Sequence, residues 1–200
     1  SVLIALSVGE LNIGIKNVLR MIFFGGDTSN IEYLLISEIR LPRIVLGIAV
    51  GGALSLAGVI LQGIYRNPLV EPFTLGISGG ASLGVAITIV LGLHVSFGSL
   101  ALPLSGFTGA LLIVILVYTI SSIKGKINIQ NMLLTGVMIS FIASSAMMFL
   151  LAISSSENLN NIIFWIMGSL DEPNNYLIRL TFISSIIVLL ISYFFVQPLN

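Results

Sequence analysis

The fold is decided by a segment that opens with Arg40-Leu-Pro-Arg43 and closes with Leu61-Gln62-Gly-Ile-Tyr-Arg66-Asn67-Pro68-Leu69-Val-Glu71-Pro72-Phe-Thr-Leu-Gly76-Ile-Ser78. Between Arg43 and Arg66 lie 22 residues without a charged side chain. Because a helix rises about 1.5 Å per residue, about 20 residues cross a hydrocarbon core of about 30 Å. This interval therefore predicts one membrane-spanning helix, over 44–64.

The proline-rich end of this segment predicts a break between two helices. Pro68 and Pro72 cannot continue a helix and favour extended backbone, and Arg66 and Asn67 place polar groups at the break. Irregular backbone at membrane depth is tolerated only where it is buried in protein or lines a water-filled path. Gln62, one helical turn earlier, is predicted to be either an interhelical hydrogen-bonding residue or a pathway residue.

The composition of the whole chain is typical of a membrane protein. Its 200 residues are 56% apolar and 8% charged, whereas soluble domains carry roughly a quarter charged residues. Eight basic and eight acidic residues leave no basic excess, which argues against a nucleic-acid partner. The chain has no cysteine, which excludes disulfides, thiol catalysis and cysteine-ligated metals. We predict no cofactor and no metal site.

The other charge-free intervals predict four further spans. The longest, 52 residues between Glu71 and Lys124, is too long for one helix and predicts two, joined by a turn at Gly92, Gly98 and Pro103. A third interval of 30 residues and the charge-free C-terminal stretch predict one helix each. The predicted spans are 44–64, 78–93, 100–122, 131–153 and 177–196.

The remaining segments are not predicted to cross the membrane. Residues 1–8 are apolar but too short to span, so we expect them to end a first membrane helix in the N-terminal part of a longer protein. Residues 9–43 hold half of the charges and predict a surface helix and a turn. Residues 154–176 predict a loop with a short helix at the interface, where Trp165 is suited to lie. The chain is predicted to be an all-α, polytopic transmembrane bundle of about six helices, forming one membrane domain over 1–200.

Small residues recur at every fourth position in two predicted spans. Helices in lipid pack by close backbone approach across such faces, so we interpret both stripes as packing surfaces. A serine-protease interpretation of Ser78 is disfavoured, because the single histidine, His94, lies beyond the same short helix. The second stripe also lacks the Gly-Lys-Ser/Thr of a phosphate-binding loop. The stripes are Gly47, Gly51 and Ser55, and Gly76, Gly80 and Gly84.

Together these motifs resemble a known family. The quoted segment is similar to the hallmark of permease subunits of ABC importers for iron–siderophore complexes, haem and vitamin B12. Leu133-Leu-Thr-Gly136-Val and Phe164-Trp165-Ile-Met-Gly168-Ser169-Leu170 extend the match, which begins at about Ile31. Some molybdate permeases share these motifs, so the motifs indicate the machine rather than its cargo.

The resemblance also implies an orientation and site residues. The distribution of Lys and Arg alone leaves the orientation open, but the family pattern places 9–43 outside and the 66–72 turn in the cytoplasm. It implies that Arg40 and Arg43 dock an external substrate-binding protein. It implies cytoplasmic gate or pathway roles for Gln62, Asn67, Leu69, Asn128 and Ile129, although Ile129 departs from the family's small polar residue.

The function implied by the resemblance is transport without enzymatic chemistry. Two copies, or this chain and a paralogue, would form a pathway for an iron chelate (siderophore or haem) across the bacterial or archaeal cytoplasmic (inner) membrane. ATP hydrolysis on separate cytoplasmic subunits would drive alternating access. Members of this family have roughly ten membrane helices, and the loop after the sixth docks on the ATPase. We therefore expect ATP coupling to need residues beyond Asn200. The alternatives are import of vitamin B12 or molybdate, or a truncated structural membrane subunit without transport activity.

Overall fold

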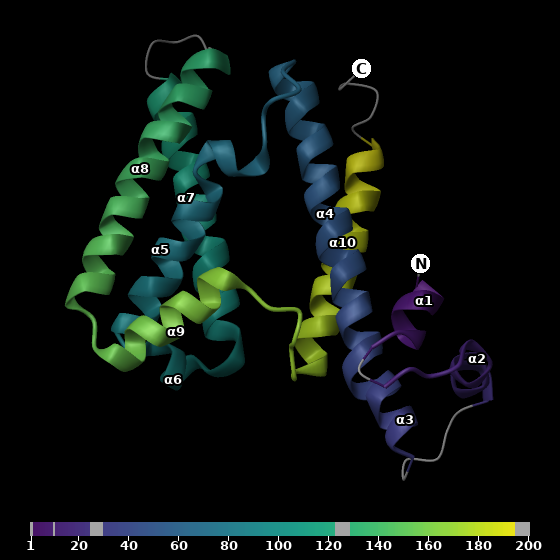
Figure 1. Ribbon diagram of the computed structural model, residues 1–200. Coiled ribbons are helices and arrows are strands. Elements are labelled where there is room, and N and C mark those ends of the chain that lie inside the picture. The colour runs from purple at the N-terminus through teal and green to yellow at the C-terminus, as the bar shows by residue number, and fades with distance from the viewer. Residues whose placement is uncertain (1, 10, 25–29, 123–128, 195–200) are drawn as a thin grey trace. The chain divides into compact units, whose positions relative to one another are not determined.

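The computed structural model describes residues 2–9, 11–24, 30–122 and 129–194. Every regular element in these ranges is a helix, in agreement with the predicted all-α fold (Figure 1). The chain divides into two compact units, one made of residues 1–57 and 169–200 and the other of residues 58–168. The assignment of 1–200 to one membrane domain stays a prediction.

A long helical rod, of which the residues up to Ala57 belong to the first unit, starts earlier than predicted. The sequence predicted a surface segment up to Arg43, but the rod begins at Ile31 and runs without a break to Tyr65. Asn30 starts it, because its side-chain carbonyl accepts a hydrogen bond from the Glu32 backbone N–H at 2.9 Å. The rod consists of α3 (Ile31–Leu34), the π-helical η1 (Leu35–Arg40) and α4 (Leu41–Tyr65).

Pro42 explains why part of the rod is π-helical. Proline inside an α-helix has no N–H to donate, and its ring clashes with the carbonyl four residues earlier. The wider π-turn relieves such a clash, and the Leu41 N–H here bonds the carbonyl of Ile36, five residues back. The helix therefore passes through Arg40-Leu-Pro-Arg43 instead of starting after it.

The rest of the first unit packs beside this rod. A small core joins Leu6, Ile13, Val18 and Ile36, all at most 3% exposed. The predicted surface helix is present. These elements are α1 (Val2–Ser7), α2 (Ile15–Phe24) and α10 (Asn175–Phe194).

The second unit is organised around one short helix. α5 (Ile77–Val90) contacts α7 (Ala101–Ser122), α8 (Ile129–Ile153) and α9 (Ser156–Met167), and Figure 1 shows α9 lying across its end. Val85, Ala86, Ile89 and Ile162 form the core of this packing, and all four are at most 2% exposed. η2 (Pro72–Leu75) precedes α5, and α6 (Leu93–Phe97) and η3 (Gly98–Leu100) follow it.

Four of the five predicted spans fall on helices that are long and apolar enough to cross a membrane, and the helix at the fifth is shorter than predicted. The helices over Ile31–Tyr65, Leu93–Ser122, Ile129–Ile153 and Asn175–Phe194 are long and apolar enough to cross a membrane. The span predicted over 78–93 is wrong in length, because α5 has only 14 residues, or about 21 Å. α5 contacts α7, α8 and α9, so protein rather than lipid covers it. A helix covered in this way need not be long enough to cross the membrane.

The predicted turn after α5 is partly helical. Gly92 and Gly98 both adopt a positive φ of 68°, as expected for turn glycines. His94, predicted to lie beyond the short helix, is in the next helix, α6, and is half-buried. Pro103 was predicted to belong to the turn but sits in the first turn of α7, where its missing N–H costs no hydrogen bond.

Candidate functional site

Arg40 holds the N-terminal segment of the first unit. Its guanidinium donates to the backbone carbonyls of Leu6 and Leu11, both at 2.6 Å. A Cβ at Gly9 would lie 2.5 Å from Arg40 Nη2, so a larger residue there would push the guanidinium out of its present position. Two of the donors that a docking partner would use are therefore already occupied within this chain.

Arg43 differs from Arg40 because it pairs with a side chain, and both partners are exposed to solvent. Its Nη2 lies 2.9 Å from Asp171 Oδ2, and the two side chains are 48% and 70% exposed. Asp171 belongs to the loop before α10, where its backbone N–H donates to Ser169 Oγ at 2.9 Å. This pair was not predicted from the sequence. The signal for it was that Asp171 stands just before one predicted span and Arg43 just before another.

The break after α4 is a turn built from its own side chains. Arg66 takes a left-handed backbone, with φ 47°, which reverses the chain at the end of the helix. Gln62 Nε2 donates to the Pro68 carbonyl at 3.0 Å, and Asn67 Oδ1 accepts from the Leu69 N–H at 3.0 Å. Gln62 thus bonds its own turn rather than a facing helix. We call residues 66–72 the crossover turn.

The crossover turn separates one exposed apolar residue from a buried one. Leu69 is 83% exposed, whereas Val70 is 3% exposed and packs with Tyr65 and Leu75. Met132 of α8 also packs on this cluster, so the structure brings the start of α8 next to the turn. Ile129 begins α8 and is 40% exposed. Asn128 lies outside the described residues.

The second glycine stripe lies at close backbone crossings. A Cβ on Gly80 would overlap the Ile113 side chain and lie 2.6 Å from the Gly109 carbonyl oxygen, and one on Gly84 would lie 2.5 Å from the Ser105 carbonyl. Gly76, with φ 80°, lies beside Gly136 of α8. Ser105 and Gly109, which sequence reasoning missed, are four residues apart and carry the same small-residue signal on α7.

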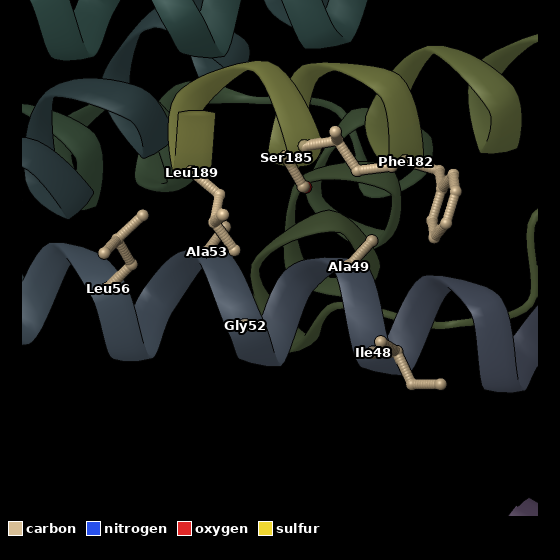
Figure 2. A pocket seen from close by; sticks show the side chains of 9 residues that line it. Ile48, Ala49, Gly52, Ala53, Leu56, Phe182, Ser185 and Leu189 are labelled. Carbon is tan, nitrogen blue, oxygen red and sulfur yellow. The ribbon is translucent and has the colours of Figure 1, made fainter. Parts of the chain in front are cut away.

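The first glycine stripe does not line the contact between α4 and α10. A groove of about 160 Å³ between these helices is lined instead by other residues, with Ser185 and Leu189 reaching toward Ala49 and Ala53 (Figure 2). Gly51 has no neighbour within 4 Å of an added Cβ, and Gly47 has only Leu170, at 3.8 Å. Ser55 bonds the Gly51 carbonyl of its own helix, at 2.8 Å. The groove is lined by Ile48, Ala49, Gly52, Ala53, Leu56, Phe182, Ser185, Ile186 and Leu189.

Ser78 and His94 do not form a catalytic pair. Ser78 is in the first turn of α5 and His94 follows its last residue. The part of α5 from Ser78 to its last residue, Val90, is about 18 Å long, whereas proton transfer needs a contact of about 3 Å.

Long apolar helices interrupted by a polar turn are typical of a multi-pass membrane protein. The chain matches the FecCD transport family along residues 1–200 and belongs to it. It is accordingly part of a permease subunit of an ABC transporter in the inner membrane, and not of the ATPase.

Individual relatives agree with this assignment. The Hemin transport system permease protein HmuU of Yersinia pestis is 34% identical over 85% of this chain and 51% of its own length. The Vitamin B12 import system permease protein BtuC of Klebsiella pneumoniae is 38% identical over 68% of this chain and 40% of its own. A solved chain described as a metal-chelate type ABC transporter, in an inward-facing conformation, covers all of this chain and 58% of its own length, with TM-score 0.77 and 27% identity. The chain spans about half the length of the curated relatives it matches.

Proposed function

We propose that this chain belongs to a permease that imports an iron chelate, either a siderophore complex or haem, by ATP-driven alternating access. The observation that carries the proposal is the similarity to the hemin permease over 85% of the chain. Similarity to a vitamin B12 permease supports cobalamin as the second candidate, and molybdate is a third. The partners in this proposal are a second permease copy or paralogue, cytoplasmic ATP-binding subunits and an external substrate-binding protein.

Arg43 is the residue proposed to dock the binding protein. Its guanidinium is nearly half exposed and pairs with Asp171, which is more exposed still. An exposed ion pair stabilises a protein by only about 0–1 kcal/mol, so a carboxylate of a partner could replace Asp171 at little cost. Arg40 supports the same surface indirectly, since it fixes the backbone of the neighbouring segment through Leu6 and Leu11.

The crossover turn is proposed to form the cytoplasmic gate together with the start of α8. Asn67 shapes the turn, and the resulting geometry presents Leu69 outward at 83% exposure. An apolar side chain held in this way is suited to meet its counterpart from a second permease copy. The Gln62 bond to Pro68 stabilises the same turn, which makes Gln62 a positioning residue here.

Transport by the full-length permease tests the proposed function. The permease, its ATPase and its binding protein are reconstituted in proteoliposomes and offered ferric siderophore, haem, cobalamin or molybdate. ATP-dependent accumulation of an iron chelate supports the proposal. Accumulation of cobalamin or molybdate alone replaces the cargo, and no accumulation of any of them favours the structural subunit without transport activity.

Docking has a separate test. Arg43→Glu is expected to weaken binding of the partner protein measured without nucleotide, whereas Asp171→Asn, which frees Arg43, is expected to leave binding equal or tighter. Equal binding by Arg43→Glu and the unaltered permease contradicts the docking role, whatever the cargo.

A further inference from the structure

The outward face of α2 combines an aromatic side chain with two cations. Phe23 is 76% exposed, and Lys16 and Arg20 are exposed beside it. The spacings of three, four and seven residues place all three on one side of the helix. Val18, on the opposite side, is fully buried in the core of the first unit.

The packing of α2 fixes its depth relative to the predicted membrane. The core that holds Val18 includes Ile36 of the rod, and Ile44 packs against the same core. Ile44 is the first residue of the 22-residue charge-free interval, so α2 lies level with the end of the span. The headgroup layer extends roughly 5–8 Å beyond the hydrocarbon core on each side.

Arg40 keeps α2 at this level. Its two hydrogen bonds to the Leu6 and Leu11 carbonyls, both 2.6 Å, tie the chain segment that leads into α2 to the rod. The helix is therefore held by a core on one side and by this clamp at its beginning, with Phe23 pointing away from both.

The charge on this face selects an anionic partner. The sequence of α2, Ile15 to Phe24, carries two basic residues and no acidic one. Among the described residues, neither Lys16 nor Arg20 forms an ion pair with a carboxylate. A bulky apolar ring favours the boundary between headgroups and acyl chains, while Lys and Arg extend to lipid phosphates. Each cation near an anionic surface contributes about 1 kcal/mol.

From this placement we propose that α2 is an interfacial helix that binds anionic phospholipid headgroups, with Phe23 entering the headgroup–acyl boundary and Lys16 and Arg20 contacting phosphates. This surface is independent of cargo and of docking at Arg43. It anchors α2, and with it the preceding segment that Arg40 bonds through Leu6 and Leu11, to the membrane surface.

Residues 1–200 contain no cysteine, so replacing any cysteine in the rest of the full-length permease by serine allows a direct test with one introduced thiol. Phe23→Cys in the full-length permease is labelled with a polarity-sensitive fluorophore in nanodiscs of phosphatidylcholine alone or with about a third phosphatidylglycerol, matching the charge requirement. Asn17→Cys is the matched control, because Asn17 is exposed on the same helix but turned away from Phe23 by about 120°. Neither side chain belongs to the core.

The proposal expects a blue-shifted emission at position 23, quenched by lipid-borne quenchers, with a water-like emission at position 17. The shift should be larger with phosphatidylglycerol, and Lys16→Gln with Arg20→Gln should remove that difference. A water-like emission at position 23 in both lipids overturns the proposal. An equal blue shift in both lipids that Lys16→Gln with Arg20→Gln leaves unchanged also overturns it. So does a blue shift that appears only when the binding protein is added, which would make this face a protein-docking surface.

Discussion

The closest helix crossing in the second unit gives the sharpest stability prediction. At Gly80 an added Cβ would lie 2.6 Å from the Gly109 carbonyl oxygen, whereas ordinary van der Waals contact begins at 3.4 Å. The obstacle is backbone and cannot rotate away, so α5 and α7 must move apart. Overpacking of this kind costs about 1–3 kcal/mol, while the higher helix propensity of alanine returns at most about 1 kcal/mol. Gly80→Ala should therefore lose about 1–2 kcal/mol of unfolding free energy.

Thermal unfolding in one detergent measures this loss. For a chain of this size 1 kcal/mol shifts the midpoint by about 2–4 °C. The matched control is Gly58→Ala in α4, since no atom lies within 4 Å of a Cβ added there. This control should be unchanged or slightly more stable, because only the propensity term acts on it.

A second substitution tests whether the crossing itself is the cause. A Cβ on Gly109 would overlap the Gly80 carbonyl, so the two alanines push on the same contact. Once one has separated the helices the other costs less, and the double variant should lose less than the sum of the two, by about 0.5 kcal/mol or more. Gly80→Ala as stable as Gly58→Ala, or fully additive losses, would refute the close crossing.

Three further substitutions test other parts of the structure. Arg40→Ala should expose the segment before α2 to faster amide exchange, because two charge-assisted hydrogen bonds worth about 1.5–3 kcal/mol each are lost. Exchange in that segment no faster than in the unaltered protein would contradict the clamp. Gln62→Ala removes the bond to Pro68, so it should lower the free energy of unfolding by about 0.5–1.5 kcal/mol and make the crossover turn more sensitive to protease. Gln62→Glu should behave like alanine, because the ionised carboxylate cannot donate this hydrogen bond. Pro42→Ala restores the missing N–H and should convert η1 to α-helix, a change visible as new amide protection at position 42; persistence of the π-turn would show that proline is not its cause.

Sequence alone predicted the membrane helices well because the bilayer imposes length and polarity on every span it exposes. The charge-free interval after Arg43 marked α4 for this reason. The same reasoning failed for α5, because α7, α8 and α9 cover this helix. A helix that is covered by protein need not match the thickness of the bilayer. The pair of Arg43 and Asp171 could not be predicted, because the two residues lie far apart in the sequence. The role of Gln62 could not be predicted either, because its partner is a carbonyl six residues away that only the folded turn brings within bonding distance.

The proposed function requires that the two ends of α4 face opposite compartments, with docking at one end and the gate at the other. Arg43→Cys and Leu69→Cys are each introduced alone into a full-length permease without other cysteines and labelled in sealed right-side-out vesicles with a membrane-impermeant maleimide. We predict rapid labelling at position 43 and labelling at position 69 only after the vesicles are permeabilised. Labelling of both positions from the same side would contradict it.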